Sequence, residues 1–159
     1  MKVFRIERAK YVKDALKGLG AASSDGMRWN SQYTRMVYTA ESRALALLEV
    51  ALHLDLIEDL PNDRWYLEIE IPDDVHIHEL SKKQLSKNWN VHPPGRQTQH
   101  IGDAFVAEGH AAVLKVPSTV VPDEFNYLIN PLHPDAKKIK IRGKKLVVFD
   151  ERIKKPLSK

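Results

Sequence analysis

Glu49 is the side chain in this sequence whose surroundings are hardest to explain by folding alone. It belongs to an apolar run, residues 44–56, whose length predicts a buried helix. On a helix its neighbours three and four positions away are Leu45, Ala46, Leu52 and His53. None of these is Lys or Arg, and buried carboxylates without a cationic partner tend to be functional. Glu49 is therefore a candidate catalytic carboxylate, the alternative being a good helix former on a solvated side.

Two further side chains could bind an anion or a hydroxyl. Arg28 follows a stretch of small residues, 21–26, and its planar fork of donors suits a pyrophosphate or a carboxylate. Ser118 follows an apolar strand pattern and could hold a ligand hydroxyl. Each has a simpler interpretation: Arg28 as a surface side chain packed on Trp29, and Ser118 as a cap of its own turn. No Gly-Xaa-Ser-Xaa-Gly motif supports a serine nucleophile.

Metal and nucleotide motifs do not account for these residues. The chain has seven histidines, of which His76 and His78 share one predicted strand face and His53 follows Glu49 by four positions. No His-Glu-Xaa-Xaa-His, P-loop or Gly-Xaa-Gly-Xaa-Xaa-Gly motif occurs. We therefore expect no metal site, and any nucleotide would be bound by a different kind of site.

The composition is that of an average globular protein. With 159 residues, 43% hydrophobic and 29% charged, the chain predicts one domain, 1–159, with its own core. It has no cysteine, which suits a reducing compartment. Residues 1–15 lack the continuous apolar segment of a signal peptide. We expect a cytoplasmic protein that does not enter membranes.

The basic residues are concentrated late in the chain. The net charge is +4 and the pI about 9.2, and most of the excess lies in residues 137–145 and in a basic C-terminal tail, 150–159. We interpret this as a solvated hairpin and tail, so that no direct nucleic-acid binding is expected. An RNA-directed or RNA-binding function through this segment remains the alternative.

The hydrophobic patterns predict a mixture of strands and helices. Expected strands are 2–7, 35–38, 65–71, 75–77, 111–116 and 127–130, followed by a hairpin of 139–141 with 146–149 across Gly143. Expected helices are 11–19, 40–58 with Thr39 as N-cap, and 99–108. No regular alternation of strand and helix is present. The predicted fold class is α+β, a single domain with a mixed or antiparallel sheet flanked by helices.

Several short segments occur in the order of a known family. They are Arg5-Ile6, Arg28-Trp29-Asn30, residues 37–42 and 44–49, Trp89, Gln97-Thr98, Ile101-Gly102-Asp103, Val116-Pro117-Ser118, and residues 120–122 and 124–135. Together they resemble the RES domain family, named for its Arg, Glu and Ser. The resemblance runs over about residues 3–142. It implies a fold like that of ADP-ribosyltransferases.

The resemblance also implies a function and a partner. Members resemble toxins that consume NAD, encoded beside an Xre-type helix-turn-helix antitoxin that would cover the active site. NAD would be cleaved at the nicotinamide–ribose bond without a metal, and its ADP-ribose would pass to water, phosphate or a protein acceptor. The oxocarbenium-like transition state of such a cleavage calls for a fixed carboxylate.

Roles for individual residues follow from the resemblance. Arg28 would hold the NAD phosphates or ribose, and Tyr38 would position the nicotinamide end. Glu49 would bind the ribose hydroxyls and stabilise the charge developing at C1′. Ser118 would help to fix the same ribose, and Asn126 would form part of the pocket wall.

The sequence departs from the family pattern beside Arg28. Many members read Gly-Gly-Arg-Trp-Asn and have another Gly a few positions later. Here Met27 replaces the second Gly, and residues 31–34 contain none. We expect a stiffer loop, or one shaped for a different acceptor.

Overall fold

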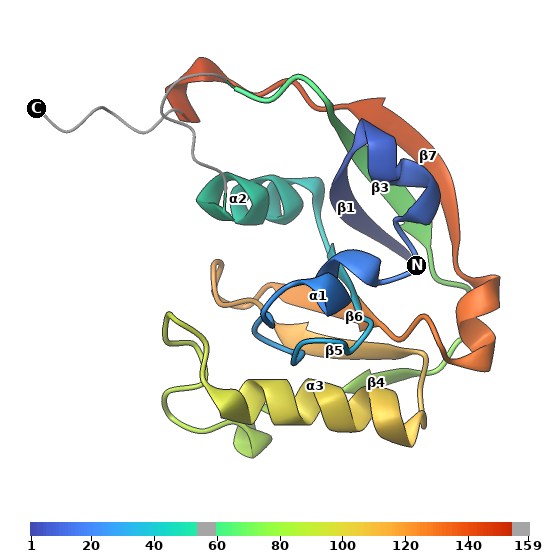
Figure 1. The fold of residues 1–159 in the computed structure, drawn as a ribbon, viewed down its shortest axis with the longest axis vertical. Coiled ribbons are helices and arrows are strands. Elements are labelled where there is room, and N and C mark those ends of the chain that lie inside the picture. Colours follow the sequence, from blue (N-terminus) through green and yellow to red (C-terminus); the bar gives the residue numbers. More distant parts are fainter. Residues whose placement is uncertain (54–59, 154–159) are drawn as a thin grey trace, which may run out of the picture.

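The computed structural model describes residues 1–53 and 60–153, and its seven strands form one sheet (Figure 1). The strands are β1 (Lys2–Arg8), β2 (Val37–Ala40), β3 (Arg64–Glu70), β4 (Ile77–Glu79), β5 (Val113–Pro117), β6 (Phe125–Ile129) and β7 (Lys140–Leu146). Their order is β4-β5-β6-β2-β1-β3-β7. Only the β4–β5 pairing is parallel, which makes the sheet mixed. The predicted α+β fold class is confirmed.

Alternating side chains give the sheet two apolar faces. Val3, Val37 and Val113 belong to one cluster of buried residues, which also packs against Val12 of the 3₁₀ helix η1 (Ala9–Asp14). The next residues along the same strands point to the opposite face. Leu114, for example, lies opposite Leu128 on β6 in a second cluster. Burial of both faces explains why few strand residues in the centre of the sheet are solvent-exposed.

Two helices divide the second face between them. The helix α2 (Arg43–His53) packs on β1 and β2 in a cluster that includes Ile6 and Leu45. The helix α3 (Arg96–Glu108) packs through Phe105 on the side of β5 and β6. Figure 1 shows α2 and α3 well separated, with the short helix α1 (Leu19–Ser23) in front of the strands between them. The two helices thus cover different parts of this face.

The predicted helix 11–19 is wrong. The segment overlaps the second half of η1, and α1 begins at Leu19, where the predicted helix was expected to end. Gly18 has a φ of +67°, and a Cβ there would lie 2.7 Å from the backbone nitrogen of Met36. The conformation and the close approach both require glycine, so this glycine marks a sharp change of direction before a helix. The first three residues of the small-residue stretch 21–26 consequently belong to α1.

The predicted C-terminal hairpin is also wrong. Residues 140–146 form the single strand β7, which pairs with β3 and contains Gly143. Gly143 lies beside an irregularity between Glu68 and Ile69, where the register shifts by one residue. A glycine inside a strand pattern is compatible with a bulge as well as with a turn. The continuous pairing of β7 with β3 shows that Gly143 lies at a bulge and not in a turn.

The start of α2 differs from its prediction. Thr39 is part of β2, and its hydroxyl donates to the carbonyl of Tyr127 at 2.6 Å. Ser42 takes the capping role, since its Oγ accepts a hydrogen bond from the backbone of Leu45. The described part of the helix ends at His53, so the predicted extension to residue 58 lies outside the described residues.

None of the helices in the described part is long and apolar enough to cross a membrane.

Candidate active site

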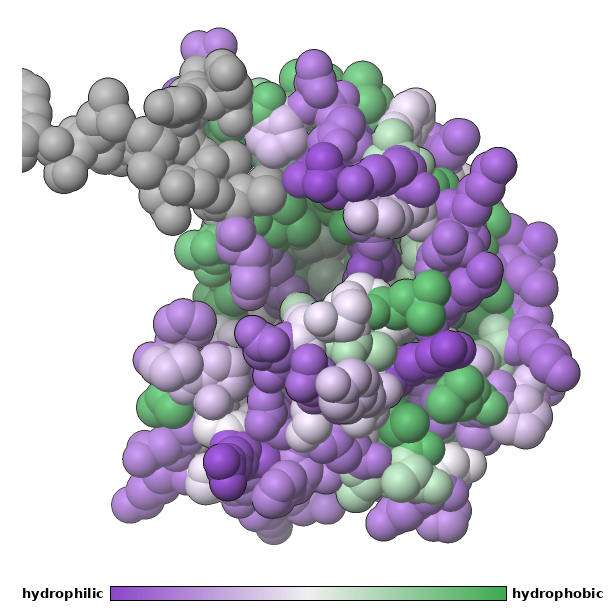
Figure 2. Space-filling view, in the orientation of Figure 1, coloured by the Kyte–Doolittle hydropathy of each residue, from purple (hydrophilic) through white to green (hydrophobic). Residues whose placement is uncertain are grey.

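Two adjoining cavities share the lining residues Met27, Tyr38, Glu49 and His53, and we call them together the cleft. The larger has a volume of about 690 Å³ and is also lined by Arg28 and Asn126. The smaller, of about 300 Å³, reaches β1 and is walled largely by apolar side chains. Figure 2 shows this side of the molecule hollowed, with hydrophobic residues in the depth and hydrophilic ones around the rim. Both volumes suit a small-molecule ligand.

Glu49 lines both cavities, as its position on α2 predicts. Burial disfavours the charged carboxylate and raises the pKa of Glu49, while the side chain of Asn126 and the nearby His53 partly offset this effect. No Lys or Arg among the described residues pairs with Glu49, which agrees with the absence of both residue types at its helical neighbours. The cleft therefore holds a carboxylate whose charge is available for a cationic group in a ligand.

Arg28 is fixed at the rim of the larger cavity. Its guanidinium donates to the carbonyls of Trp89, at 2.7 Å, and Val91, at 3.0 Å. Partial burial lowers its pKa from a very high ordinary value, so the group stays charged. A guanidinium has five N–H donors. The two bonds fix its plane and leave donors for a ligand.

Helix α3 holds the segment that carries Arg28. Gln99 donates to the carbonyl of Met27 at 3.0 Å, and Asp103 accepts from the backbone of Ser31 at 2.9 Å. Gly102 lets the helix approach so closely that a Cβ there would lie 1.7 Å from the carbonyl oxygen of Trp29. The residues around the sequence motif Ile101-Gly102-Asp103 thus position Arg28 without touching the cleft themselves.

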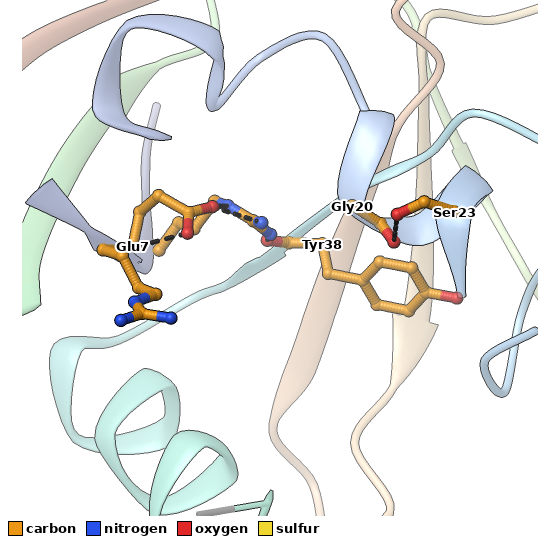
Figure 3. A network of polar contacts seen from close by, with 6 residues as sticks. Glu7, Gly20, Ser23 and Tyr38 are labelled. Carbon is orange, nitrogen blue, oxygen red and sulfur yellow. Dashed lines mark hydrogen bonds and ion pairs between the residues drawn. The ribbon is translucent and has the colours of Figure 1, made fainter. Parts of the chain in front are cut away.

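Tyr38 joins the same segment to the centre of the sheet. Its hydroxyl donates to Asn30 at 2.7 Å and accepts from the backbone of Trp29 at 3.1 Å, and burial raises its pKa. Its carbonyl accepts from Arg5, which is paired with Glu7. Figure 3 shows Glu7 on one side of the Tyr38 carbonyl and the ring of Tyr38 extending away on the other side. The ring is thereby fixed in the wall of both cavities.

Ser118 lies beside the cleft, but its hydroxyl is turned to its own loop. The Oγ accepts hydrogen bonds from the backbones of Val120 and Val121, at 3.0 and 3.1 Å. Its neighbours Pro117 and Thr119 line the larger cavity, whereas Ser118 is not among the lining residues. The capping interpretation is therefore realised in the structure. A contact of Ser118 with a ligand stays a prediction.

Asn126 lies in the larger cavity, as the resemblance implied, and its amide donates to the carbonyl of Thr39 at 3.3 Å. Residues that the sequence did not single out for this role also contribute. Met27 and His53 line both cavities, and Asn90 and His92 line the larger one. Met27 could have been found because it precedes Arg28, and His53 because it lies one helical turn after Glu49. Nothing in the sequence indicated that the loop around Asn90 would fold over the cleft.

The loop after Arg28 explains the departure at residues 31–34. Tyr33 has a φ of +71°, in the region that favours glycine, and its side chain is 82% exposed. The chain thus adopts a left-handed conformation at a residue that carries a side chain, and that side chain points to solvent. No cluster of three or more potential metal ligands occurs in the described part of the chain.

Some basic residues in and before strand β7 have acidic or aromatic partners. Arg142 pairs with Glu70 at 2.6 Å, and Lys138, just before the strand, pairs with Asp74 and Asp135. Lys144 lies over the ring of Trp65. Folding contacts therefore engage Lys138, Arg142 and Lys144, so these three side chains do not by themselves indicate an RNA-binding surface.

A family model described as the RES domain matches residues 2–150. The chain belongs to the RES domain family. The match covers nearly all of the described residues and includes each segment that lines the cleft. The resemblance noted in the sequence is thereby confirmed.

Relatives within the RES family carry informative names. A protein named Prs ADP-ribosylating toxin, from Sphingobium sp. (strain YBL2), is 41% identical over 90% of this chain and 89% of its own. A protein named Toxin Res, from Photorhabdus laumondii subsp. laumondii, is 37% identical over 87% of this chain and 86% of its own. The M. tuberculosis MbcT–MbcA toxin–antitoxin complex contains a chain with a TM-score of 0.73 at 18% identity, covering 92% of this chain and 83% of that one. That likeness supports the same fold.

Proposed function

We propose that this RES-family protein is the toxin of a toxin–antitoxin pair and cleaves NAD at the nicotinamide–ribose bond. The observation that carries the proposal is the cleft itself, in which Glu49, Arg28, Tyr38 and Asn126 line one cavity of about 690 Å³. The names of the relatives, which include an ADP-ribosylating toxin, support the same direction.

The residues of the cleft fit the charges of this reaction. Cleavage leaves a neutral nicotinamide and builds positive charge at the ribose C1′, which a carboxylate such as Glu49 stabilises. The remaining donors of Arg28 suit the pyrophosphate. The ring of Tyr38 offers a flat apolar surface at the junction of the two cavities for the nicotinamide end. Asn126 adds an amide to the wall, and Ser118 supports the turn beside the ribose, with its hydroxyl hydrogen still able to donate.

Release of nicotinamide from NAD by the purified protein tests the proposal. The wild-type protein should release nicotinamide, and Glu49→Gln should lower the rate by at least about a hundredfold, because an amide cannot balance the developing charge. Glu108→Gln, an exposed carboxylate at the end of α3, is the matched control and should leave the rate unchanged. Equal rates for Glu49→Gln and wild type would contradict the proposal.

A partner that blocks the cleft follows from such an activity. An enzyme that consumes NAD harms its own cell, so we propose that an antitoxin, of the Xre helix-turn-helix type, covers the mouth of the cleft. The structural neighbour MbcT–MbcA is a toxin–antitoxin complex, which supports the general form of this arrangement. Co-expression with the product of an adjacent gene should restore growth and abolish nicotinamide release. A partner that restores growth without reducing release would contradict an active-site block.

The acceptor of the ADP-ribosyl group is part of the proposal. The name of the Sphingobium relative supports transfer to a protein, and water is the acceptor for plain NAD hydrolysis. Incubation with NAD labelled in the adenylate part, with and without cell extract, separates these products. Labelled protein bands indicate transfer, and free ADP-ribose indicates hydrolysis.

A further inference from the structure

His53 stands one helical turn after Glu49 and lines both cavities with it. Residues four apart on a helix share a face, so the imidazole and the carboxylate are presented to the cleft from the same side. When protonated, His53 lowers the pKa of Glu49. The role given to Glu49 does not use this imidazole.

The hydrogen bond of His53 determines which of its nitrogens can act. Its Nδ1 lies 2.7 Å from the backbone carbonyl oxygen of Glu49. A carbonyl oxygen only accepts, so Nδ1 carries a hydrogen and donates it. In the neutral ring the lone pair is then on Nε2, the nitrogen on the far side from the helix backbone. The contact both orients the ring and leaves its basic nitrogen available.

Building on the proposed function, we propose that His53 is the general base that deprotonates the acceptor, and that the acceptor is therefore a neutral nucleophile carrying a proton: water, or the hydroxyl or amine of a protein side chain. As the C1′–nitrogen bond breaks, its electron pair leaves with neutral nicotinamide. The acceptor oxygen or nitrogen forms a bond to C1′. Its proton passes to Nε2 of His53 and then to solvent.

The other charged and titratable groups of the cleft are less suited to this step. Glu49 is needed in its charged form at C1′. Arg28 and Arg5 cannot accept a proton, and the hydroxyl of Tyr38 is bonded to Asn30 and the backbone of Trp29. His92, in the wall of the larger cavity, is the remaining imidazole among the described lining residues. It comes from the loop that Arg28 holds, not from the helix that carries Glu49.

An anionic nucleophile that carries no proton separates this role from a structural one. We expect His53→Ala to slow NAD hydrolysis roughly a hundredfold, the usual size of a general-base contribution. Sodium azide should then restore NAD cleavage in His53→Ala, with ADP-ribosyl azide detected by mass spectrometry, because azide needs no base. Glu49→Gln should not be restored, since its defect is at C1′. His76→Ala, an exposed histidine in the loop before β4, is the matched control and should behave as wild type.

The outcomes distinguish the two proposals. A wild-type protein that releases no nicotinamide overturns the proposed function. If the wild type releases it, hydrolysis by His53→Ala at the wild-type rate overturns the role of His53. Slow hydrolysis that azide does not restore also overturns it. Wild-type cleavage that depends on inorganic phosphate, and that His53→Ala retains, overturns the choice of a protic acceptor, because phosphate is already anionic. An unchanged melting temperature of His53→Ala shows that the variant is folded.

Discussion

Helix α2 and the turn after β5 form two walls of the cleft, with Glu49 and His53 on the first and Pro117 and Thr119 on the second. In the turn, the hydroxyl of Ser118 accepts two backbone hydrogen bonds and so stabilises the local structure. On α2, the carboxylate of Glu49 has no Lys or Arg partner among the described residues, and its burial opposes its charge. The hydroxyl of Ser118 contributes to the stability of the fold, whereas the buried charge of Glu49 costs stability. Substitutions should therefore change stability and activity in different proportions in the two walls.

Glu49→Gln should have the most different effects on stability and on activity. Activity should be lost, as argued above, while the melting temperature should rise. A carboxyl with a raised pKa in the folded state contributes stability when protonated and loses it as the pH rises from its ordinary unfolded value toward the raised one. At neutral pH the charged Glu49 therefore lowers stability, and glutamine removes that cost. Thermal unfolding at pH 4 and pH 7 measures this, and an equal gain at both pH values would contradict the burial effect.

Arg28→Lys should lower both the stability and the activity moderately. Lysine keeps the charge but cannot contact the carbonyls of Trp89 and Val91 while also presenting a planar fork. We expect the KM for NAD to rise about tenfold, which corresponds to ~1.4 kcal/mol, with a smaller change in kcat. Steady-state kinetics and thermal unfolding are the measurements. An unchanged KM would mean that Arg28 only anchors the loop.

Ser118→Ala should act mainly on stability. Loss of the hydroxyl that caps the turn should cost ~1 kcal/mol, or about 3 °C in melting temperature for a chain of this size. Ser118→Thr, which keeps an oxygen, is the control. Cleavage of NAD at saturating substrate should stay within about threefold of wild type. A large rise in KM with an unchanged melting temperature would instead place the hydroxyl on the ribose.

Tyr33→Gly should give the smallest effect, a gain in stability of about 0.5 kcal/mol. The left-handed backbone of Tyr33 is strained for a side chain, and little burial is lost with a ring that is 82% exposed. Part of the gain is offset by the greater freedom of glycine in the unfolded state. Chemical denaturation measures the difference. A loss of stability would show that the exposed ring makes contacts that matter to the fold.

The fold was predictable where side-chain patterns and pairing agreed. Strand β3 alternates cleanly and was predicted within one residue of its bounds. The predictions at Gly18 and Gly143 were wrong, because the meaning of each glycine depends on distant partners, the backbone of Met36 in one case and strand β3 in the other. Local patterns carry no information on such partners.

The candidate residues differ in how they could be found. Glu49 follows from helical geometry and the absence of basic neighbours, which are local properties. Arg28 and Ser118 depended on the resemblance, because an arginine in a loop or a serine after a strand has many ordinary uses. The local pattern offered the capping orientation of Ser118 as the simpler interpretation, whereas the resemblance implied a contact with the ribose. In the structure the hydroxyl of Ser118 bonds to the backbones of Val120 and Val121, in the turn that connects the paired strands β5 and β6.

The order of the strands has a genetic consequence. Strand β1, the first in the sequence, lies between β2 and β3, while β6 near the opposite end of the chain pairs with β2. The lining of the cleft runs from Phe4 to Asn126. A stop codon or frameshift before codon 126 removes a central strand together with one wall of the cleft. In a selection for cells that survive expression of this gene, disabling nonsense and frameshift mutations should therefore scatter over the whole of this stretch, whereas missense survivors should concentrate at the cleft.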